Sequence, residues 1–542
     1  MTGRMTGLLA LCLLAAPLAA QAQSPSVIVP EGRADQTPPP PRERRELIPQ
    51  GQGQPGGTPQ IAPFTLSRVV VTGSTLPPAE LDAAWRPFAG RTIDGAGLER
   101  ITDALLDAYR RSDVAIYTVL VPGQDFAGGV LRVSVLEGWI ESAAIRGGEG
   151  GKARSRVEGY VDRLRDERPL RRTSLQRYVS LIRDIPGLRS DMRLLTGQRP
   201  EGVRLELDLD PRPVQFGLAV NNRGTAFLGR TQVSADLYLN SLLRGGDQTR
   251  VTIAAPTDVE RFQYYAVSHA TPLGGEGTTL QVMAGHLRTR PQGVTLRGRA
   301  GSLGVLLTHP LVRSYDQDLY LSLGVDGLDA ENAFLGNTFS DDRTRAARAA
   351  LAYTWQSDRR LAYLSGTLSV GIDGLGARTA DPAVTELAFA KGNVRARYST
   401  YLGDQLLVRL NAAGQWTADR LPPSEQFALG GDEFGRAYEA ATVAGDYGLA
   451  GSAELAWRPP RLQRMVSGAE AYAFFDGGKV WYRSRLGAPT ADARLASAGV
   501  GVRGAWREHV SVELEAAKAL NNPLPYLDRD DWRGVFAVRT FW

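Results

Sequence analysis

The sequence contains a single cysteine in 542 residues, Cys12, which lies in an apolar run close to the N-terminus. Leu11 rather than a small residue precedes it, so the position does not suit a lipoprotein anchor. Because no cysteine follows, the rest of the chain has no disulfide framework, no thiolate metal site and no cysteine nucleophile.

Long apolar runs are also missing. After residue 22 no segment approaches the roughly 18 uninterrupted apolar residues of a membrane-spanning helix, which excludes helical spans. An outer-membrane β-barrel is not excluded, because its alternating strands keep the mean hydropathy low. The net charge of +5 is too dilute over this length to indicate a nucleic-acid partner.

Enzyme signatures are lacking as well, since there is no P-loop, no HExxH zinc helix and no Gly-x-Ser-x-Gly nucleophile elbow. A barrel enzyme would need a Ser/His or Asp/His constellation. Three of the four histidines fall within predicted strands and the other adjoins a turn proline; they are His269, His286, His509 and His309. We therefore predict that the protein is not an enzyme, and we expect no catalytic residue, no bound metal and no cofactor.

The N-terminus predicts export from the cytosol. Arg4 supplies a positive charge, Leu8 to Leu18 an apolar stretch too short to span a bilayer, and Ala20-Gln21-Ala22 a small-x-small cleavage site. Residues 1–22 are therefore predicted to be a secretory signal peptide. Residues 23–62 are rich in proline, glutamine and glycine, which predicts an extended or disordered linker.

Two successive units of the order β-α-α-β-β are predicted at residues 63–138 and 139–213. In the first unit, Val69 to Val71 form a strand, and Asp94 can cap a helix whose apolar residues recur at helical spacing. The second unit closes on a strand from Val203 to Asp210, in which apolar and charged residues alternate strictly. A single irregular α/β domain is the alternative.

From residue 214 to residue 542 helical periodicity almost disappears, and segments of about ten residues with period two recur between turns. In one of them, Leu319 to Asp326, Leu or Val alternates with Tyr, Ser, Gly and Asp. About sixteen such segments can be counted, which is the spacing of a transmembrane barrel. The predicted fold class is therefore a 16-stranded antiparallel transmembrane β-barrel preceded by two α+β units.

A soluble β-sandwich or propeller would also show alternation. In strand after strand, however, the polar face carries isolated charges, which would be very costly in a dry core and are acceptable beside a wet lumen. The charged residues are Arg348, Arg395, Arg397, Arg409, Glu454 and Glu470. The last segment ends on the aromatic residue Trp542, which resembles the assembly signal of bacterial outer-membrane barrels.

The segment from about residue 418 to 447 is too long for a simple hairpin, so we predict a functional loop. In it, Arg436 lies between the bulky Phe434 and Tyr438. A later strand reads Phe-Phe-Asp-Gly-Gly at 474–478, and its alternation with charged residues places Asp476 on the lumen face. The planar guanidinium of arginine suits a carboxylate partner. A glycine-rich loop with one arginine and one aspartate is, by itself, more often only a turn with a solvated charge.

These features together resemble a two-partner secretion transporter of the TpsB family over essentially the whole mature chain. The two α+β units resemble its POTRA domains, with Leu-Glu-Gly-Trp-Ile-Glu at 136–141 matching their junction, and Asn221 to Gly224 resembles the start of its barrel. The family's loop tip, Val-Arg-Gly-Tyr or a near variant, is matched by Gly-Arg-Ala-Tyr at 435–438, where Ala437 replaces the usual glycine. Its Phe-x-Asp-x-Gly strand motif is met by Phe474, Asp476 and Gly478.

The resemblance implies that the loop folds into the lumen and that Arg436 and Asp476 lock it there. The gating residues it implies are Gly435, Arg436 and Tyr438, and the partner motif on the wall is Phe474, Asp476 and Gly478. It implies export of a large unfolded exoprotein, such as a haemolysin, an adhesin or a contact-inhibition toxin, from the periplasm to the surface of a bacterium. The implied partners are that exoprotein with its signal-bearing N-terminal domain, outer-membrane lipid, and the barrel-assembly machinery for insertion.

A POTRA unit can bind an extended segment of the substrate by strand addition at an exposed sheet edge. The candidate contacts are Val203, Leu205 and Leu207, the alternative being that their strand pairs internally. Family members often have an N-terminal helix that plugs the pore, but the proline-broken linker does not suit a helix of about 20 residues, so we expect this plug to be absent or replaced by a coil. A barrel-assembly factor of the same superfamily is the alternative function, which the presence of only two POTRA units disfavours.

Overall fold

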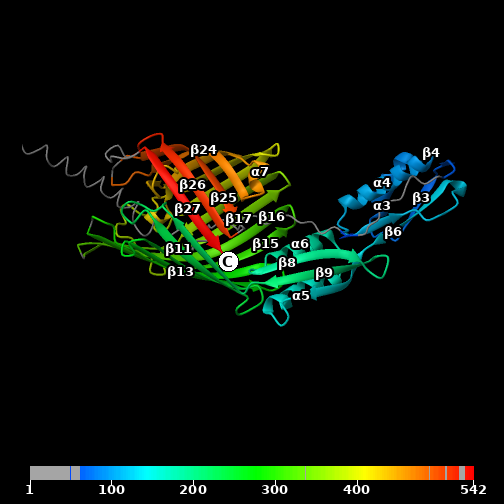
Figure 1. Cartoon of the computed structure of the whole chain (residues 1–542), viewed down its shortest axis with the longest axis horizontal. Helices are drawn as coiled ribbons and strands as arrows, with labels where there is room; N and C mark the ends of the chain where they lie inside the picture. The colour runs from blue at the N-terminus through cyan, green and yellow to red at the C-terminus, as the bar shows by residue number, and fades with distance from the viewer. Residues whose placement is uncertain are drawn as a thin grey trace, which may run out of the picture.

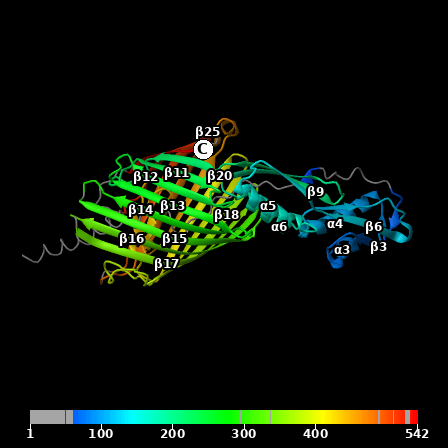
Figure 2. The same cartoon turned by 90° about the horizontal axis from the view of Figure 1, so that it is seen from below.

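The computed structural model describes residues 49–50, 61–293, 295–335, 337–486, 489–506, 509–523 and 531–542. The predicted signal peptide, nearly all of the linker and any N-terminal plug lie outside these residues. The described chain forms an elongated molecule, with a barrel at one end and two smaller α+β units in line with it (Figure 1 and Figure 2). Within this part of the chain, no helix is both long enough and apolar enough to cross a membrane.

The first α+β unit packs two helices on a three-stranded sheet with the order β3-β6-β5. Its α4 begins as predicted, because the side chain of Asp94 accepts a hydrogen bond from the backbone N–H of Gly97 at 2.7 Å. The buried face of α4 includes Ile101 and Leu105, both fully buried. The elements are β2 (Phe64–Thr65), β3 (Arg68–Thr72), α3 (Pro78–Trp85), β4 (Thr92–Ile93), α4 (Gly95–Arg111), β5 (Tyr117–Leu120) and β6 (Val130–Glu137).

One buried carboxylate ties this unit together. Glu137, at the end of β6, accepts hydrogen bonds from the backbone N–H of Thr75 at 2.7 Å and from the hydroxyl of Tyr109 at 2.6 Å. Burial, together with the bond to Glu137, raises the pKa of the Tyr109 hydroxyl. The junction residue Glu137 therefore links β6 to α4 and to the turn after β3.

The second unit repeats this architecture. It consists of β7 (Trp139–Arg146), α5 (Lys152–Arg165), α6 (Arg172–Arg183), β8 (Leu188–Thr196) and β9 (Gly202–Pro211). Its strands follow the order β8-β9-β7, and the short strand β1 (Pro49–Gln50) adds in parallel to the outer edge of β8 at Leu194 and Leu195.

The strand proposed from the sequence as a substrate contact is an internal one. β9 pairs antiparallel with β8 on one side and parallel with β7 on the other, so both of its hydrogen-bonding edges are occupied. The three candidate side chains, Val203, Leu205 and Leu207, are buried in the core beneath α5 and α6. With both edges occupied, β9 cannot accept an added strand in this fold. The sequence allowed the edge position because an internal strand and an edge strand show the same alternation.

The second unit is joined to one end of the barrel through its helices. In α6, Arg177 donates a hydrogen bond to the carboxylate of Glu276 at 3.1 Å. Arg156 of α5 donates to the carbonyl of Gly245 at 2.9 Å. From the barrel, Arg313 makes a bidentate pair with Asp184, the residue that follows α6, at 2.8 and 2.9 Å. These contacts mark the barrel end that faces the α+β units.

Within the described residues, sixteen strands close into a barrel, which confirms the predicted fold class. Each strand pairs antiparallel with the next, and β10 pairs with β27 to complete the ring. The strands are β10 (Val214–Asn221), β11 (Gln232–Asn240), β12 (Gln248–Pro256), β13 (Phe262–Leu273), β14 (Thr278–Thr289), β15 (Leu296–Arg313), β16 (Gln317–Phe334), β17 (Asn337–Gln356), β18 (Arg360–Gly371), β19 (Ala390–Leu402), β20 (Leu406–Thr417), β23 (Tyr447–Trp457), β24 (Ser467–Tyr482), β25 (Ala491–Trp506), β26 (Val510–Ala519) and β27 (Trp532–Phe541).

The two faces of the barrel wall differ as the alternation predicts. Leu323 and Val325 of β16 are exposed on the outside, whereas Asp326 pairs with Arg348 of β17 in the interior at 2.6 Å. At the closing seam, Trp542 exchanges two backbone hydrogen bonds of 2.9 Å with Phe216, and their rings stack. An apolar outer face with charges on the inside is the pattern of a barrel in lipid with a wet lumen.

Candidate functional site

The long loop between β20 and β23 folds back into the barrel. It contains β21 (Phe427–Leu429) and β22 (Val443–Gly445), which pair with each other as a short hairpin. Leu429, Phe434 and Tyr438 of the loop are buried and share one apolar cluster with wall residues of β24 and β25, including Phe474 and Leu495. The loop is therefore packed on the inner wall.

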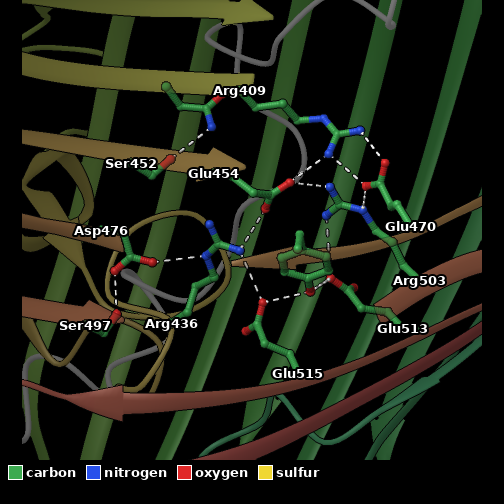
Figure 3. A network of polar contacts seen from close by, with 12 residues as sticks. Arg409, Arg436, Ser452, Glu454, Glu470, Asp476, Ser497, Arg503, Glu513 and Glu515 are labelled. Carbon is green, nitrogen blue, oxygen red and sulfur yellow. Dashed lines mark hydrogen bonds and ion pairs between the residues drawn. The ribbon is translucent and has the colours of Figure 1, made fainter. Parts of the chain in front are cut away.

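Arg436 lies at the centre of the contact between the loop and the wall (Figure 3). Its guanidinium donates to Asp476 at 3.0 Å, to Glu454 at 3.2 Å and to Glu515 at 3.2 Å. Its side chain is only 8% exposed, and its Cζ lies 3.6 Å from the centre of the Phe474 ring. One loop cation thus faces three wall carboxylates and an aromatic face, which together stabilise its charge where water is scarce.

Asp476 is held in place by the loop backbone as well as by the arginine. Its Oδ1 accepts hydrogen bonds from the backbone N–H of Gly435 at 2.8 Å and from the hydroxyl of Ser497, while Oδ2 accepts from Arg436. The carboxylate is fully buried. The sequence places Asp476 on the lumen face, and the structure brings it together with Arg436, but Ser497 was not anticipated.

The two motif glycines allow the loop and the wall to come close. Gly435 has a φ of 86°, and a Cβ there would lie 2.5 Å from Leu495. A Cβ on Gly478 would lie 2.6 Å from the carbonyl oxygen of Leu449 and 2.8 Å from the Leu429 side chain. Ala437, which stands in place of the usual glycine, is not among the described non-glycine residues with positive φ, so the alanine is accommodated without backbone strain.

Tyr438 fixes the other side of the loop tip. Its hydroxyl donates to the backbone carbonyls of Ala496 at 2.9 Å and Asn521 at 2.6 Å, and its ring is fully buried. Its own carbonyl accepts a hydrogen bond from Arg533 of β27. The tip is therefore connected to the last strand of the barrel as well as to β24.

Beyond Arg436 the ion pairs continue along the wall. Arg409 contacts both Glu454 and Glu470 at 2.7 Å, and Arg503 contacts the same two carboxylates (Figure 3). The alternation of strands places Arg409, Glu454 and Glu470 in the lumen, as predicted. Arg503 was missed, although period-two alternation on β25 was a signal that could have found it.

A second cluster of charges holds the loop before its tip. Glu425 accepts from Arg348 at 2.8 and 3.1 Å and pairs with Lys391 at 2.8 Å, and all three side chains are at most 3% exposed. Closer to the tip, Glu433 pairs with Arg395 at 2.6 Å and with Arg397 at 3.4 Å, in a more exposed setting. The wall arginines were predicted from the sequence to face the lumen, but their loop partners were not.

The predicted substrate contacts in β9 are not part of this site, because they lie in the core of the second α+β unit. A barrel with an apolar outer face that holds its own long loop in the lumen and carries small α+β units at one end is the architecture expected of the outer-membrane transporters that the sequence resembles. Residues 203–504 match the family described as haemolysin secretion/activation protein ShlB/FhaC/HecB, and residues 64–138 match the ShlB-type POTRA domain. The first match covers more than half of the sequence, and the chain belongs to this family.

Similar proteins carry transporter names. The chain is 26% identical over 515 residues to the outer membrane transporter CdiB of Escherichia coli, covering 88% of this chain and 82% of that protein. It is 18% identical over 479 residues to the heme/hemopexin transporter protein HuxB of Haemophilus influenzae, covering 85% and 84% of the two chains. The family resemblance inferred from the sequence is thereby confirmed, and the family is one of transporters rather than enzymes.

Solved structures show the same fold. CdiB from Escherichia coli superposes with a TM-score of 0.73 at 22% identity, covering 98% of this chain and 97% of that one. CdiB from Acinetobacter baumannii gives a TM-score of 0.64 at 15% identity, with 89% and 91% covered. The family match and the outer-membrane transporter names of its relatives identify the protein as an outer-membrane barrel, and its POTRA domains lie in the periplasm.

This localisation fixes the direction of the long loop. Arg313, at the end of β15, contacts the second α+β unit, so β15 ends on the periplasmic side. The strands then alternate in direction through β16, β17, β18 and β19, and β20 consequently ends on the side of the cell surface. The loop therefore leaves the barrel at the surface end and turns inward.

Proposed function

We propose that this transporter exports one large exoprotein, in unfolded form, from the periplasm to the cell surface. The family and the transporter names of its relatives support the class of function, and the wet, charged lumen supports passage of a polar extended chain. The proposed partner is a haemolysin, an adhesin or a contact-inhibition toxin with its own signal-bearing N-terminal domain. Because the periplasm offers no ATP, capture of the substrate and its folding outside drive the movement.

The long loop acts as the gate in this proposal. The observation that carries it is the pair between Arg436 and Asp476, 3.0 Å apart at the centre of a buried network. Losing one such charge-assisted hydrogen bond costs about 1.5–3 kcal/mol, an amount that binding of a substrate segment can offset. Gly435 and Gly478 let the loop lie close to the wall, and Tyr438 and Phe474 seat it there.

The periplasmic units capture the substrate in the same proposal. Since β9 is internal, the available sheet edges are those of outer strands, such as β5 in the first unit and the part of β8 that β1 does not cover. An extended segment of the exoprotein adds to such an edge through main-chain hydrogen bonds, which give affinity with modest sequence dependence.

Insertion of the barrel itself requires lipid and a helper. The closing strand β27 ends at Phe541, with Trp542 directly after it, and aromatic side chains at the end of a closing strand suit recognition by the barrel-assembly machinery. The belt of exposed Leu, Val, Phe and Trp side chains then contacts outer-membrane lipid.

The test is to replace Arg436 by Ala and to measure how much of the partner protein, identified from the neighbouring open reading frame, reaches the cell surface. We expect export to fall while the amount of folded barrel stays normal, because the tip loses its main contact with the wall and Asp476 loses its cation. Arg359→Ala is the matched control, since Arg359 makes a 2.6 Å pair with Asp404 in which both side chains are exposed. Normal export by Arg436→Ala at a normal barrel level would show that the lock has no role in secretion.

A further inference from the structure

The long loop consists of two parts that are attached to the barrel in different ways. We define the base as residues 421–429 and 443–446, which include the β21–β22 hairpin, and the tip as residues 430–442, which include Arg436. The base is bonded to Gln415, near the surface end of β20, whereas the tip carries Arg436 into the buried network in the lumen (Figure 3). The contacts of each part indicate which one can move.

Glu425 anchors the first leg of the base, and the signs of the paired charges are the reverse of those at the tip. Here the loop supplies the anion and the wall supplies the cations Arg348 and Lys391. Asp326 of β16 makes a second bidentate pair with Arg348 at 2.6 and 2.9 Å, which fixes the guanidinium. Because Glu425 lies between two wall cations, one of which Asp326 also holds, removing one partner leaves an uncompensated buried charge in the cluster.

Asp446 anchors the second leg. It is fully buried and accepts a bidentate pair from Arg485, with both distances 2.7 Å. It also accepts the backbone N–H groups of Leu421 and Arg483, at 2.9 and 2.7 Å. One carboxylate thus fastens both legs of the base to the segment after β24.

Glycines separate the base from the tip. Gly430 and Gly431 follow β21 directly and have φ values of 105° and 110°, a region that side chains rarely allow. On the returning leg, Ala441 has a φ of 53° just before β22. A change of backbone angles at these residues would bend each leg where the base meets the tip, which makes them the candidate hinge.

The tip has contacts that water and a passing chain can reach more readily. Glu433 is 37% exposed on its side chain, and its partner Arg395 is 38% exposed. On its other side, the Glu439 carboxylate accepts a hydrogen bond from the backbone N–H of Ala226 in an exposed setting. Arg436 and Tyr438 are the buried seats of the tip, and both lie beyond the glycine pair.

We infer that gating moves only the tip, residues 430–442, about the Gly430–Gly431 hinge, while Glu425 and Asp446 hold the base on the wall throughout the transport cycle. This inference rests on the proposed function, because it states which part of the proposed gate moves. Glu425 and Asp446 are positioning residues: their side chains bond to the base and the barrel wall and not to Arg436 or Asp476, and they act by keeping the tip in register with Asp476.

The test uses single cysteines, which the chain allows because its sole cysteine, Cys12, lies in the predicted signal peptide. Ala437→Cys reports on the tip and Ser424→Cys on the base; both positions are buried, at 4% and 5% exposure. Full-length protein in intact cells is treated from outside with a membrane-impermeant maleimide. In an Arg436→Ala background we expect labelling of the tip cysteine to rise by roughly tenfold or more, and labelling of the base cysteine to change little.

The reverse arm releases the base. In a Glu425→Gln background the base cysteine gains reactivity although Arg436 is intact, and Glu425→Asp restores part of the protection, because it keeps the anion. Labelling of both cysteines in Arg436→Ala would show that the whole loop leaves, and labelling of neither would show that the tip is not a hinged unit. Either result overturns the inference, while the export assay of Arg436→Ala still decides the proposed function separately.

A disulfide provides the functional arm. The hydroxyl oxygens of Thr344 on the wall and Ser424 on the base lie 3.2 Å apart, so cysteines at both positions are close enough to be joined. We expect the oxidised Thr344→Cys/Ser424→Cys protein to export its partner at the rate seen after reduction. Export that is blocked until the disulfide is reduced would mean that the base has to move, and would refute the hinge while leaving the gate itself intact.

Discussion

Removing the loop cation should open the channel far more than neutralising its main wall partner does. In Arg436→Met, Asp476 loses its cation and keeps only the N–H of Gly435 and the Ser497 hydroxyl, whereas Glu454 keeps Arg409 at 2.7 Å. Because one buried charge is then uncompensated, we expect a loss near the lower end of the range for breaking a buried pair, about 3 kcal/mol.

Asp476→Asn should cost less. Arg436 keeps Glu454 and Glu515, each at 3.2 Å, so the change removes mainly one charge-assisted hydrogen bond, about 1.5 kcal/mol. The difference corresponds to roughly a tenfold larger ratio of open to closed channels in Arg436→Met than in Asp476→Asn. The double variant should resemble Arg436→Met rather than the sum of the two, because the residues share one interaction.

The assay is the fraction of time that single channels of the purified protein spend in the high-conductance state in planar lipid bilayers, at fixed voltage and salt concentration. Arg359→Ala, in its exposed pair with Asp404, serves as the control and should behave as the unchanged protein does. Equal effects of the two single variants, or additive effects in the double variant, would contradict the ion-pair account of closure.

Other features of the structure make further predictions. Gly478→Ala introduces a Cβ 2.6 Å from a backbone oxygen and 2.8 Å from Leu429, so we expect the barrel to lose about 1–3 kcal/mol of stability, measured as a lower temperature of heat modification on gels. Arg313→Ala breaks the bidentate pair with Asp184. The distribution of distances between spin labels on the second α+β unit and on the barrel should therefore broaden, and a narrow distribution would contradict a role of this pair in joining the two parts. The raised pKa of Tyr109 means that its hydroxyl ionises less readily in the folded first unit than in the unfolded chain. The stability that Tyr109 contributes is therefore present below the ordinary tyrosine pKa of about 10 and is lost as the pH rises above it. In chemical unfolding, Tyr109→Phe should abolish this dependence of the free energy of unfolding on pH, and an unchanged dependence would refute the assignment.

Much of the barrel follows from alternation in the sequence alone. Leu323 and Val325 point outward and Asp326 inward because the period of a strand is two, and the lumen position of Asp476 follows from Glu470 in the same way. The sequence also predicts a long loop that contains Arg436. The pairing of Arg436 with Asp476, in contrast, was implied by resemblance to a family and not by the alternation of residues.

What the sequence could not predict depends on contacts distant along the chain. Arg348 was placed in the lumen, but its partner Glu425 lies 77 residues away in a three-residue 3-10 helix, Pro423–Glu425, which is too short for any periodicity to fix the direction of a side chain. The position of β9, at the edge of its sheet or inside it, was left open by the sequence for a different reason. An internal strand with one face under helices alternates like an edge strand, and only the pairing with β8 and β7 distinguishes the two.

The three carboxylates around Arg436 determine the charge that the wall presents when the tip is displaced. When the guanidinium leaves, Asp476 and part of the charge of Glu454 and Glu515 face the bore without a counter-ion. In the gating that we propose, opening therefore exchanges one cation for another: a lysine or arginine of the exported chain, or a cation from the medium, takes the position that Arg436 leaves. Stretches of cargo that lack basic residues leave the site negative, which draws the arginine back and favours reclosure.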